Sequence, residues 1–379
     1  METPAYRGQY RAGVIGHTGR GNYGHGLDLA LCGLPGVDIV AVADPDEAGR
    51  REAVRRIGAA KGYADYRQML EAERLDVVVV APRHPDQHEA MLLAAIASGV
   101  RAIYCEKPFV RTLEEADRVL AAAEAHGTKI AVAHQNRAFP APRLARRLVA
   151  EGRIGRLRAL RAYGKQDRRG GGQDLMVLGT HLLDLMRWLA GNAHWCHARV
   201  CADGRDATSL DVRPGEEGVG LVMGDDIVAQ YGFEHGITGS FETTQAGDGG
   251  KGNYFRLDLC GTSGIITIWS SATMPLYLYP RPFVLPDEGD AWKGVPVEPL
   301  PMPPGAPEGV STMHPANQLL VRDLLAAVED DRRPLSSGEE ARAALEMIMA
   351  VYASHIACSR VPLPLAQRTH PLEHWRSRA

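Results

Sequence analysis

The chain has 379 residues, of which 45% are hydrophobic and 23% charged, and its formal net charge at pH 7 is -3. This length predicts about two domains, and the small net charge excludes a polyanion such as nucleic acid as the expected partner. Basic clusters at 143–147 and 153–161 are interleaved with apolar residues, which is typical of solvated helix and strand faces.

The first eleven residues are polar and lack the apolar core of a signal peptide, and no run in the chain is apolar enough to span a membrane. Six cysteines are scattered without zinc-type pairs, which favours reduced thiols over disulfides and predicts no metal site. We therefore expect a cytoplasmic protein with no membrane partner.

A glycine-rich turn follows the first predicted strand, residues 12–15, and precedes a predicted helix at 27–34. A second apolar strand, 37–43, ends at Asp44. This strand–turn–helix–strand–acid order is typical of dinucleotide binding, in which glycines and a helix N-terminus hold the pyrophosphate and the acid binds the ribose. The charge of Asp44 would repel a 2′-phosphate, so NAD is favoured over NADP. The predicted cofactor contacts in the turn are Gly16, His17, Thr18, Gly19, Arg20 and Gly21.

The match is imperfect, because Thr18 stands where the middle glycine is usual, and a glycine-rich turn without a ligand is the alternative. Helices and strands alternate through the rest of this region, so we predict a doubly wound parallel sheet in a Rossmann domain at 1–139. The predicted helices are 47–57, 66–73, 89–98 and 113–126, and the predicted strands are 61–63, 77–81, 102–104 and 129–133.

Two charged residues and a proline, Glu106, Lys107 and Pro108, end one of these buried strands and are predicted cofactor contacts. Ligands bind at the carboxyl ends of strands in such sheets, and a desolvated lysine can reach a pKa suited to proton transfer. A surface ion pair that caps the strand is the alternative. Pro82 and His88 follow the neighbouring strand and are predicted as further cofactor contacts.

Together with the glycine turn and Asp44, the Glu106-Lys107-Pro108 motif resembles the Gfo/Idh/MocA family of sugar and inositol oxidoreductases. The resemblance implies that Lys107 lies beside the nicotinamide and the substrate carbinol, and that Pro108 shapes the nicotinamide pocket. It also implies that Asn136 and Arg137, which follow a later strand, line the sugar pocket.

The second half begins with a predicted link at 140–142, a helix at 143–151 and a strand at 158–163. The polar, glycine-rich segment 165–173 is predicted to be a loop over the active site. Lys165 and the following Asp174 are predicted substrate contacts, and for Asp174 a loop cap is the alternative.

A helix with Thr180 as its N-cap is predicted next, because Leu182, Leu185, Met186 and Leu189 form an apolar stripe. His181 and Asp184 share another face of this helix. A histidine in the first turn is disfavoured as imidazolium by the helix dipole, and a neutral imidazole can act as a base. A capping or half-buried structural histidine is the alternative.

The resemblance extends to this helix, because family members carry a Gly-x-His-x-x-Asp pattern that Gly179, His181 and Asp184 match. It implies that His181 is the general base and that Asp184 orients it or binds a substrate hydroxyl. Polyol dehydrogenases of the family usually place an aspartate four residues before the histidine, where this chain has Val177. That departure leaves room for a different substrate or reaction.

Short apolar runs at 196–269, with a hairpin turn at 261–264, predict a mainly antiparallel sheet. Amphipathic helices are predicted at 317–328 and 339–357, and the proline-rich segment 275–307 is expected on the surface. We predict a second α+β domain at 140–379 for substrate binding and oligomerisation. The resemblance implies that one face of its sheet forms a homodimer or homotetramer.

The sequence therefore predicts an NAD-dependent oxidoreductase that acts on a hydroxyl of a sugar, cyclitol or sugar derivative. One alternative is redox-neutral glycoside cleavage, in which NAD oxidises a sugar carbon, elimination follows and the hydride returns. A second alternative is a non-catalytic dinucleotide-binding sensor, which would need neither Lys107 nor His181.

Overall fold

The computed structural model describes residues 5–245, 254–270, 274–306 and 310–376, so parts of the predictions for the N-terminus, the antiparallel sheet and the proline-rich segment lie outside it. The chain forms two compact units, residues 1–138 with 300–342 and residues 139–299 with 343–379. In the described ranges, none of the helices combines the length and apolar character needed to cross a membrane.

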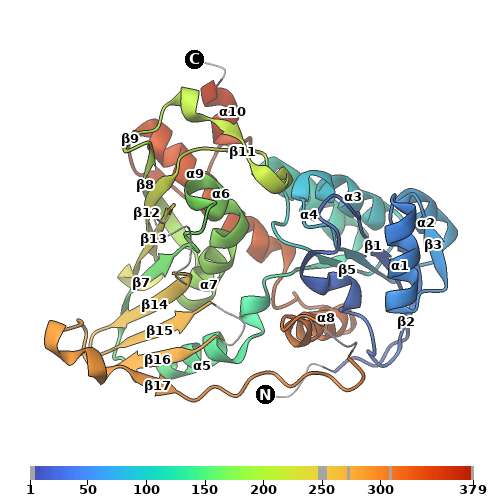
Figure 1. Cartoon of the computed structure of the whole chain (residues 1–379), viewed down its shortest axis with the longest axis horizontal. Coiled ribbons are helices and arrows are strands. Elements are labelled where there is room, and N and C mark those ends of the chain that lie inside the picture. Colours follow the sequence, from blue (N-terminus) through green and yellow to red (C-terminus); the bar gives the residue numbers. More distant parts are fainter. Residues whose placement is uncertain (1–4, 246–253, 271–273, 307–309, 377–379) are drawn as a thin grey trace. The chain divides into compact units, whose positions relative to one another are not determined.

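The first unit contains the predicted Rossmann sheet, with six parallel strands in the order β3-β2-β1-β4-β5-β6 (Figure 1). The strands are β1 (Tyr10–Ile15), β2 (Val37–Ala43), β3 (Lys61–Tyr63), β4 (Val77–Val80), β5 (Ala102–Cys105) and β6 (Lys129–Val132). The last residues of neighbouring strands are paired in register, for example Ile15 with Ala43 and Val80 with Cys105. The loops that follow them therefore start at one edge of the sheet.

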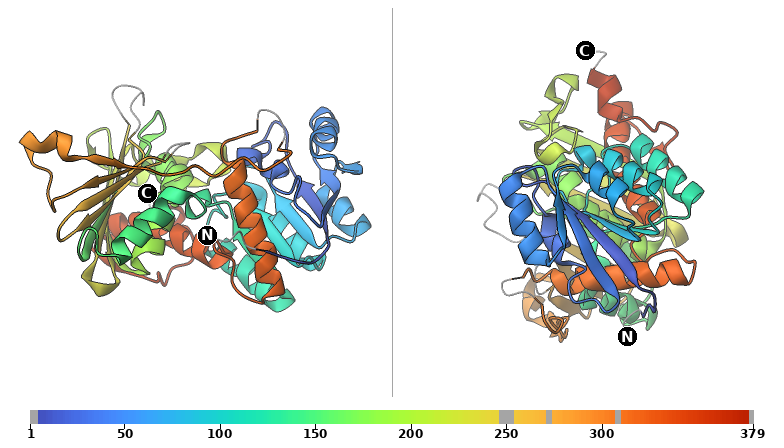
Figure 2. Two further views of the ribbon diagram at one scale, coloured as in Figure 1. Left: turned by 90° about the horizontal axis from the view of Figure 1, so that it is seen from below. Right: turned by 90° about the vertical axis from the view of Figure 1, so that its right-hand side faces the viewer.

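Five α-helices cover this sheet, namely α1 (Glu47–Ile57), α2 (Tyr66–Ala72), α3 (His88–Ala97), α4 (Leu113–His126) and α8 (His314–Glu329). Asp46 caps α1 by accepting from the backbone N–H of Gly49, and Gly58 ends it in the left-handed conformation. Helix α8, orange in Figure 2, comes from the C-terminal part of the chain and packs on β5 and β6.

The predicted helix at 27–34 is wrong. The glycine turn instead leads into a 3₁₀ segment, η1 (Gly24–Leu29), in which His25 and Gly26 have positive φ angles. The side chain of Asn317 in α8 donates from Nδ2 to the carbonyl of His25 at 3.1 Å. That carbonyl is thus bound outside the helix, which interrupts the regular hydrogen-bond pattern.

The second unit contains a ten-stranded mixed sheet in the order β17-β16-β15-β14-β7-β13-β12-β8-β18, with β9 paired to β8, and a two-stranded β10-β11 ribbon. The sheet is antiparallel except where β7 and β13 pair in parallel, and residues 261–264 form the predicted turn between β14 and β15. The strands are β7 (Leu157–Tyr163), β8 (Ala193–Ala202), β9 (Arg205–Asp206), β10 (Arg213–Pro214), β11 (Leu221–Val222), β12 (Asp226–Phe233), β13 (Thr238–Thr244), β14 (Arg256–Gly261), β15 (Ile265–Trp269), β16 (Leu276–Tyr279), β17 (Lys293–Val295) and β18 (Val361–Pro362).

The predicted link at 140–142 forms the first turn of α5, which begins at Pro140. Proline is well tolerated in a first helical turn, where its missing N–H would have no partner within the helix. Helices α5 and α7 pack on this sheet through β15 and β7 (Figure 1). The remaining helices are α5 (Pro140–Ala150), α6 (Gly170–Asp174), α7 (Thr180–Ala190), α9 (Gly338–Ala357) and α10 (Pro371–Arg376), with 3₁₀ turns η2 (Pro85–Gln87), η3 (Gln135–Arg137), η5 (Ser209–Asp211), η6 (Glu216–Gly218), η7 (Glu234–Gly236) and η8 (Pro286–Ala291).

Candidate active site

The carboxyl edge of the Rossmann sheet brings together most of the predicted site residues. The glycine turn follows β1, Asp44 follows β2, and the later loops follow β4, β5 and β6. The predicted residues in this unit are Gly16, His17, Thr18, Gly19, Arg20, Gly21, Asp44, Pro82, His88, Glu106, Lys107, Pro108, Asn136 and Arg137, whereas Lys165, Asp174, His181 and Asp184 lie in the second unit.

Close approach explains the glycines of the turn. A Cβ on Gly16 would lie 2.0 Å from the ring of Tyr23, and a Cβ on Gly21 would lie 2.7 Å from the backbone nitrogens of Arg83 and His84. Gly21 also has a φ of +82°, which L side chains rarely adopt. These glycines are therefore required by the packing of the turn itself, and their contacts with a dinucleotide stay a prediction. η1 is a short 3₁₀ segment and not the expected helix, and several N–H groups of the turn already donate within it, for example those of His17, Gly19 and Arg20.

Asp44 is fully buried, and both of its carboxylate oxygens accept hydrogen bonds from within the unit. The backbone N–H of Asp46 donates to Oδ1 at 3.0 Å. The hydroxyls of Thr18 and Tyr23 each donate to Oδ2 at 2.8 Å, and the N–H of Thr18 approaches both oxygens. The carboxylate of Asp44 thus accepts several hydrogen bonds that hold the turn together. Its contact with the ribose stays a prediction.

Glu106 and Lys107 are buried, with 0% and 1% exposure, which excludes the alternative of a surface ion pair. Glu106 Oε1 lies 2.6 Å from Nδ1 of His25, while Oε2 has no hydrogen-bond partner among the described residues. A Cβ on Gly24 would lie 2.9 Å from the Glu106 carboxyl carbon, so only glycine allows this approach. Glu106 is therefore held tightly beside Lys107, and sequence reasoning missed His25 as its partner.

Further contacts tie the loop after β4 to its neighbours. Arg20 pairs with Asp86, and His17 Nδ1 lies 3.1 Å from Oε1 of Gln87. His88 is fully buried, with its two ring nitrogens 2.7 Å from the carbonyl oxygen of Pro82 and 3.0 Å from that of Pro108. These internal contacts hold the loops that would form the site. The contacts of these residues with a cofactor stay predictions.

Asn136 and Arg137 are buried after β6 in η3. The Arg137 guanidinium donates to the carbonyl of Leu335 at 2.8 Å and pairs with Glu340 at 2.6 Å, both in the same unit. Nδ2 of Asn136 is buried without a hydrogen-bond partner among the described residues. The Asn136 amide could therefore donate a hydrogen bond to a ligand. Both remain predicted substrate contacts.

His181 and Asp184 lie in α7, where they are 8% and 0% exposed. The predicted N-cap at Thr180 is wrong, because a π-helical segment, η4 (Leu175–Gly179), runs directly into α7 and Gly179 has right-handed helical angles. His181 therefore does not lie in a first helical turn, and the dipole argument for its neutral form fails. π segments in helices are frequent at functional sites, which keeps this helix a candidate.

Asp174 ends α6 and is fully buried. Its Oδ2 accepts from the Thr243 hydroxyl at 2.6 Å and from the N–H of Gln166 at 3.2 Å, and its Oδ1 has no partner among the described residues. Burial raises the pKa of Asp174, because desolvation disfavours the carboxylate. Lys165, by contrast, is half-exposed and lies 3.4 Å from Asp167.

Family comparisons agree with this arrangement. Residues 10–134 match the model of the oxidoreductase family with an NAD-binding Rossmann fold. The chain belongs to the Gfo/Idh/MocA family. Residues 147–363 match the family's C-terminal α/β domain, so the predicted family and fold class are confirmed over most of the chain.

Among the similar proteins, levoglucosan dehydrogenase of Pseudarthrobacter phenanthrenivorans is 30% identical over 258 residues, which are 62% of this chain and 65% of that enzyme. Inositol 2-dehydrogenase of Burkholderia multivorans is 34% identical over 164 residues, or 42% of this chain and 48% of that enzyme. The chain thus spans less than two thirds of each of these two relatives. A solved levoglucosan dehydrogenase in complex with NADH and levoglucosan has a TM-score of 0.72 at 22% identity, covering 95% of this chain and all of the other, which shows the shared fold.

Proposed function

We propose that the protein is an NAD-dependent dehydrogenase that oxidises a hydroxyl group of a sugar, a cyclitol or a sugar derivative, or reduces the corresponding ketone. One observation carries the proposal, namely a buried lysine, Lys107, at the carboxyl end of β5 in a member of an NAD-binding oxidoreductase family. The similar levoglucosan and inositol dehydrogenases support a polyhydroxylated substrate.

The roles of the chain's own groups follow from their chemistry. NAD, when bound, accepts the hydride from the substrate carbon. Lys107 would hydrogen-bond the reacting oxygen, and His181 would accept the hydroxyl proton as general base. Asp184, one turn further along α7, would orient His181. Asn136 offers its buried amide to other substrate hydroxyls.

The test is NADH formation by the purified protein with a panel of sugars and cyclitols. Replacing Lys107 by Met or Arg should abolish most of this turnover while NAD still binds, since the glycine turn is untouched. A matched control is Lys129→Met, because Lys129 pairs with Asp331 outside the carboxyl edge of the sheet. Turnover by Lys107→Arg at the wild-type rate would refute a proton-transfer role, because guanidinium does not release a proton near neutral pH.

Redox-neutral glycoside cleavage is a second candidate, favoured by the raised pKa of the buried Asp174. A carboxyl group with a raised pKa is better suited to donate a proton to a leaving glycosyl oxygen than an ordinary one. In that reaction the hydride taken from one sugar carbon returns to the product, so no NADH accumulates. Release of NADH in proportion to product would exclude it as the main activity.

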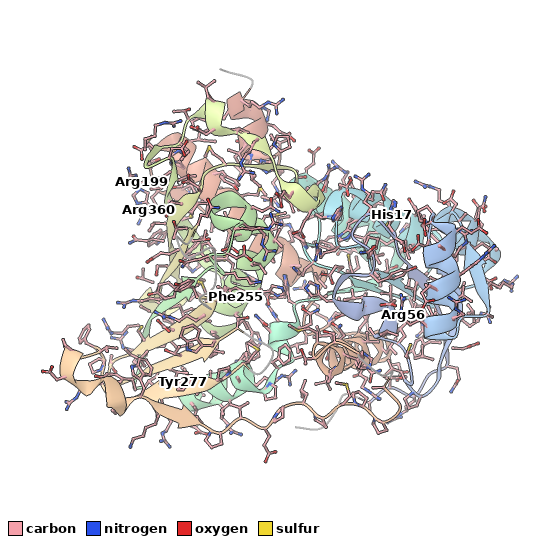
Figure 3. All side chains as sticks on the ribbon, viewed as in Figure 1. His17, Arg56, Arg199, Phe255, Tyr277 and Arg360 are labelled. Carbon is pink, nitrogen blue, oxygen red and sulfur yellow. The ribbon has the colours of Figure 1, made fainter. Side chains whose placement is uncertain are left out.

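We also propose that the open face of the ten-stranded sheet forms a homodimer or homotetramer in a cytoplasmic protein. A cavity of about 580 Å³ on this sheet is lined by aromatic and basic side chains, among them Tyr163, Arg256 and Tyr277, the last labelled in Figure 3. The Arg256 guanidinium lies 4.3 Å from the ring centroid of Tyr163. Light scattering of wild type and Tyr277→Asp tests the assignment, and an unchanged oligomer would reject it.

A further inference from the structure

The carboxylate of Asp44 has no free acceptor capacity in this structure. A carboxylate offers about four lone-pair sites. Oδ1 accepts from the backbone N–H of Asp46 at 3.0 Å, and the backbone N–H of Thr18 lies 3.1 Å from Oδ1 and 3.0 Å from Oδ2. Oδ2 accepts from the hydroxyls of Thr18 and Tyr23, both at 2.8 Å. With the side chain 0% exposed, all four sites are in use.

A ribose diol binds to such an acid by donating its hydroxyl protons. It can do so here only if an internal donor leaves Asp44. The two backbone N–H groups cannot leave without a change of the main chain, because one belongs to Thr18 in the glycine turn and the other to Asp46, two residues after Asp44. The hydroxyls of Thr18 and Tyr23 are different, since they belong to side chains: the Thr18 hydroxyl can leave by rotation about χ1, and the Tyr23 hydroxyl can leave if its ring moves from its place beside Gly16.

A cavity of about 410 Å³ next to these hydroxyls makes their release feasible. Thr18 and Tyr23 both line it, together with polar groups of α1 that include Glu52 and Arg56. The Arg56 guanidinium, labelled in Figure 3, lies 5.1 Å from the ring centroid of Tyr23 and gives the ring a contact independent of its hydroxyl. A hydroxyl that leaves Asp44 on this side would meet water and polar groups.

The hydroxyl of Tyr23 is a donor over the whole physiological pH range. Burial and the neighbouring Asp44 raise its pKa well above the usual value, so it does not ionise. Its bond to Asp44 Oδ2 therefore persists in the free protein until another donor replaces it.

We propose that the hydroxyls of Tyr23 and Thr18 occupy the ribose-binding positions of Asp44, and that NAD binding exchanges them for the hydroxyls of the adenosine ribose. Tyr23 is then a residue that sets cofactor affinity by stabilising the free state. The inference rests on the proposed function only in its use of NAD, and not on any substrate.

The test is the dissociation constant of NAD for Tyr23→Phe, measured by titration calorimetry. The variant keeps the ring over Gly16 and loses only the competing hydroxyl, so NAD should bind about 3- to 30-fold more tightly. Nicotinamide mononucleotide, which lacks the adenosine ribose, should show no such gain. The matched control is Tyr63→Phe, because Tyr63 also donates to a carboxylate of the same unit, Glu73 Oε1 at 2.6 Å.

Unchanged or weaker NAD binding by Tyr23→Phe would overturn the proposal and make Asp44 a permanent organiser of the turn. Thr18→Val, which removes the second hydroxyl at constant shape, provides an independent variant with the same expected gain, and carries the decision if Tyr23→Phe does not fold. The outcome is separate from the proposed function. A tightened NAD complex without NADH formation on any sugar would refute the dehydrogenase and leave the exchange intact.

Discussion

Replacement of Asn317 by Ala should destabilise the first unit strongly. Asn317 lies in α8 and is fully buried. Its Oδ1 accepts from the Tyr104 hydroxyl at 2.8 Å and from Gln135 Nε2 at 3.0 Å, and its Nδ2 donates to the carbonyl of His25. One side chain thus joins α8 to β5, to the loop after β6 and to η1.

The expected cost follows from the groups that the substitution would strand. The Tyr104 hydroxyl and the Gln135 amide are 0% and 2% exposed, and each buried group left without a partner costs about 1–3 kcal/mol. The His25 carbonyl belongs to a half-buried residue, so water can replace the lost donor. We expect Asn317→Ala to lower the free energy of unfolding of this unit by about 4 kcal/mol.

The assay is native-state hydrogen exchange of amides in β5, β6 and α8, which reports local stability. Tryptophan fluorescence is unsuitable, because all five tryptophans lie in the second unit. In a Tyr104→Phe background the same substitution should cost about 1–3 kcal/mol less, since no hydroxyl is left stranded. Asn192→Ala serves as the control, because that exposed side chain has a bond to Arg187 at the surface. A loss below about 1 kcal/mol for Asn317→Ala would refute the reasoning.

Three further outcomes are expected. Lys107→Arg should lower turnover by about two to four orders of magnitude in steady-state assays while the NAD dissociation constant stays within a few-fold; normal turnover would contradict the role. Because burial raises the pKa of Asp174, its contribution to stability is full below its unfolded pKa near 4 and is lost as pH rises through the folded pKa. Asp174→Asn should therefore gain stability relative to wild type with rising pH in urea titrations, and a parallel pH dependence of the two proteins would reject this. Gly16→Ala must displace the Tyr23 ring and should lower the melting temperature. The control is Gly294→Ala, whose Cβ would have its nearest neighbour at 3.9 Å and should leave the melting temperature unchanged. Equal melting temperatures of the two variants would show that the Tyr23 ring moves without cost.

The first sheet could be predicted from the sequence because its information is local. The four valines of β4 are all buried, as expected for a central parallel strand. Asp44 and the Glu106-Lys107 pair each follow such an apolar run, and the parallel order then places both at one edge. The sequence could not predict which side chains donate to Asp44. Tyr23 reaches this carboxylate only because of the three-dimensional course of the glycine turn.

The place of α8 shows a different limit. Its apolar stripe predicted an amphipathic helix, but a stripe does not say which sheet it covers. The helix belongs to the first unit, and buried polar contacts of Asn317 with Tyr104 and Gln135 specify that position. A buried asparagine within an apolar stripe was the available signal. The domain division at 139 and 140 stays a prediction.

The helix that carries His181 shows why residue counting can fail near a functional site. An acid four residues before the histidine would share its face in a regular α-helix. Here residue 177 lies within the π segment Leu175–Gly179, where bonds run from i to i+5 and the faces shift. Val177 therefore does not mark the position that an acid would occupy in a regular helix. The position of Asp174 is set instead by its hydrogen bonds with Thr243 and the backbone of Gln166. Its spacing from His181 in the sequence therefore does not decide whether it replaces the usual aspartate; its contacts and protonation do.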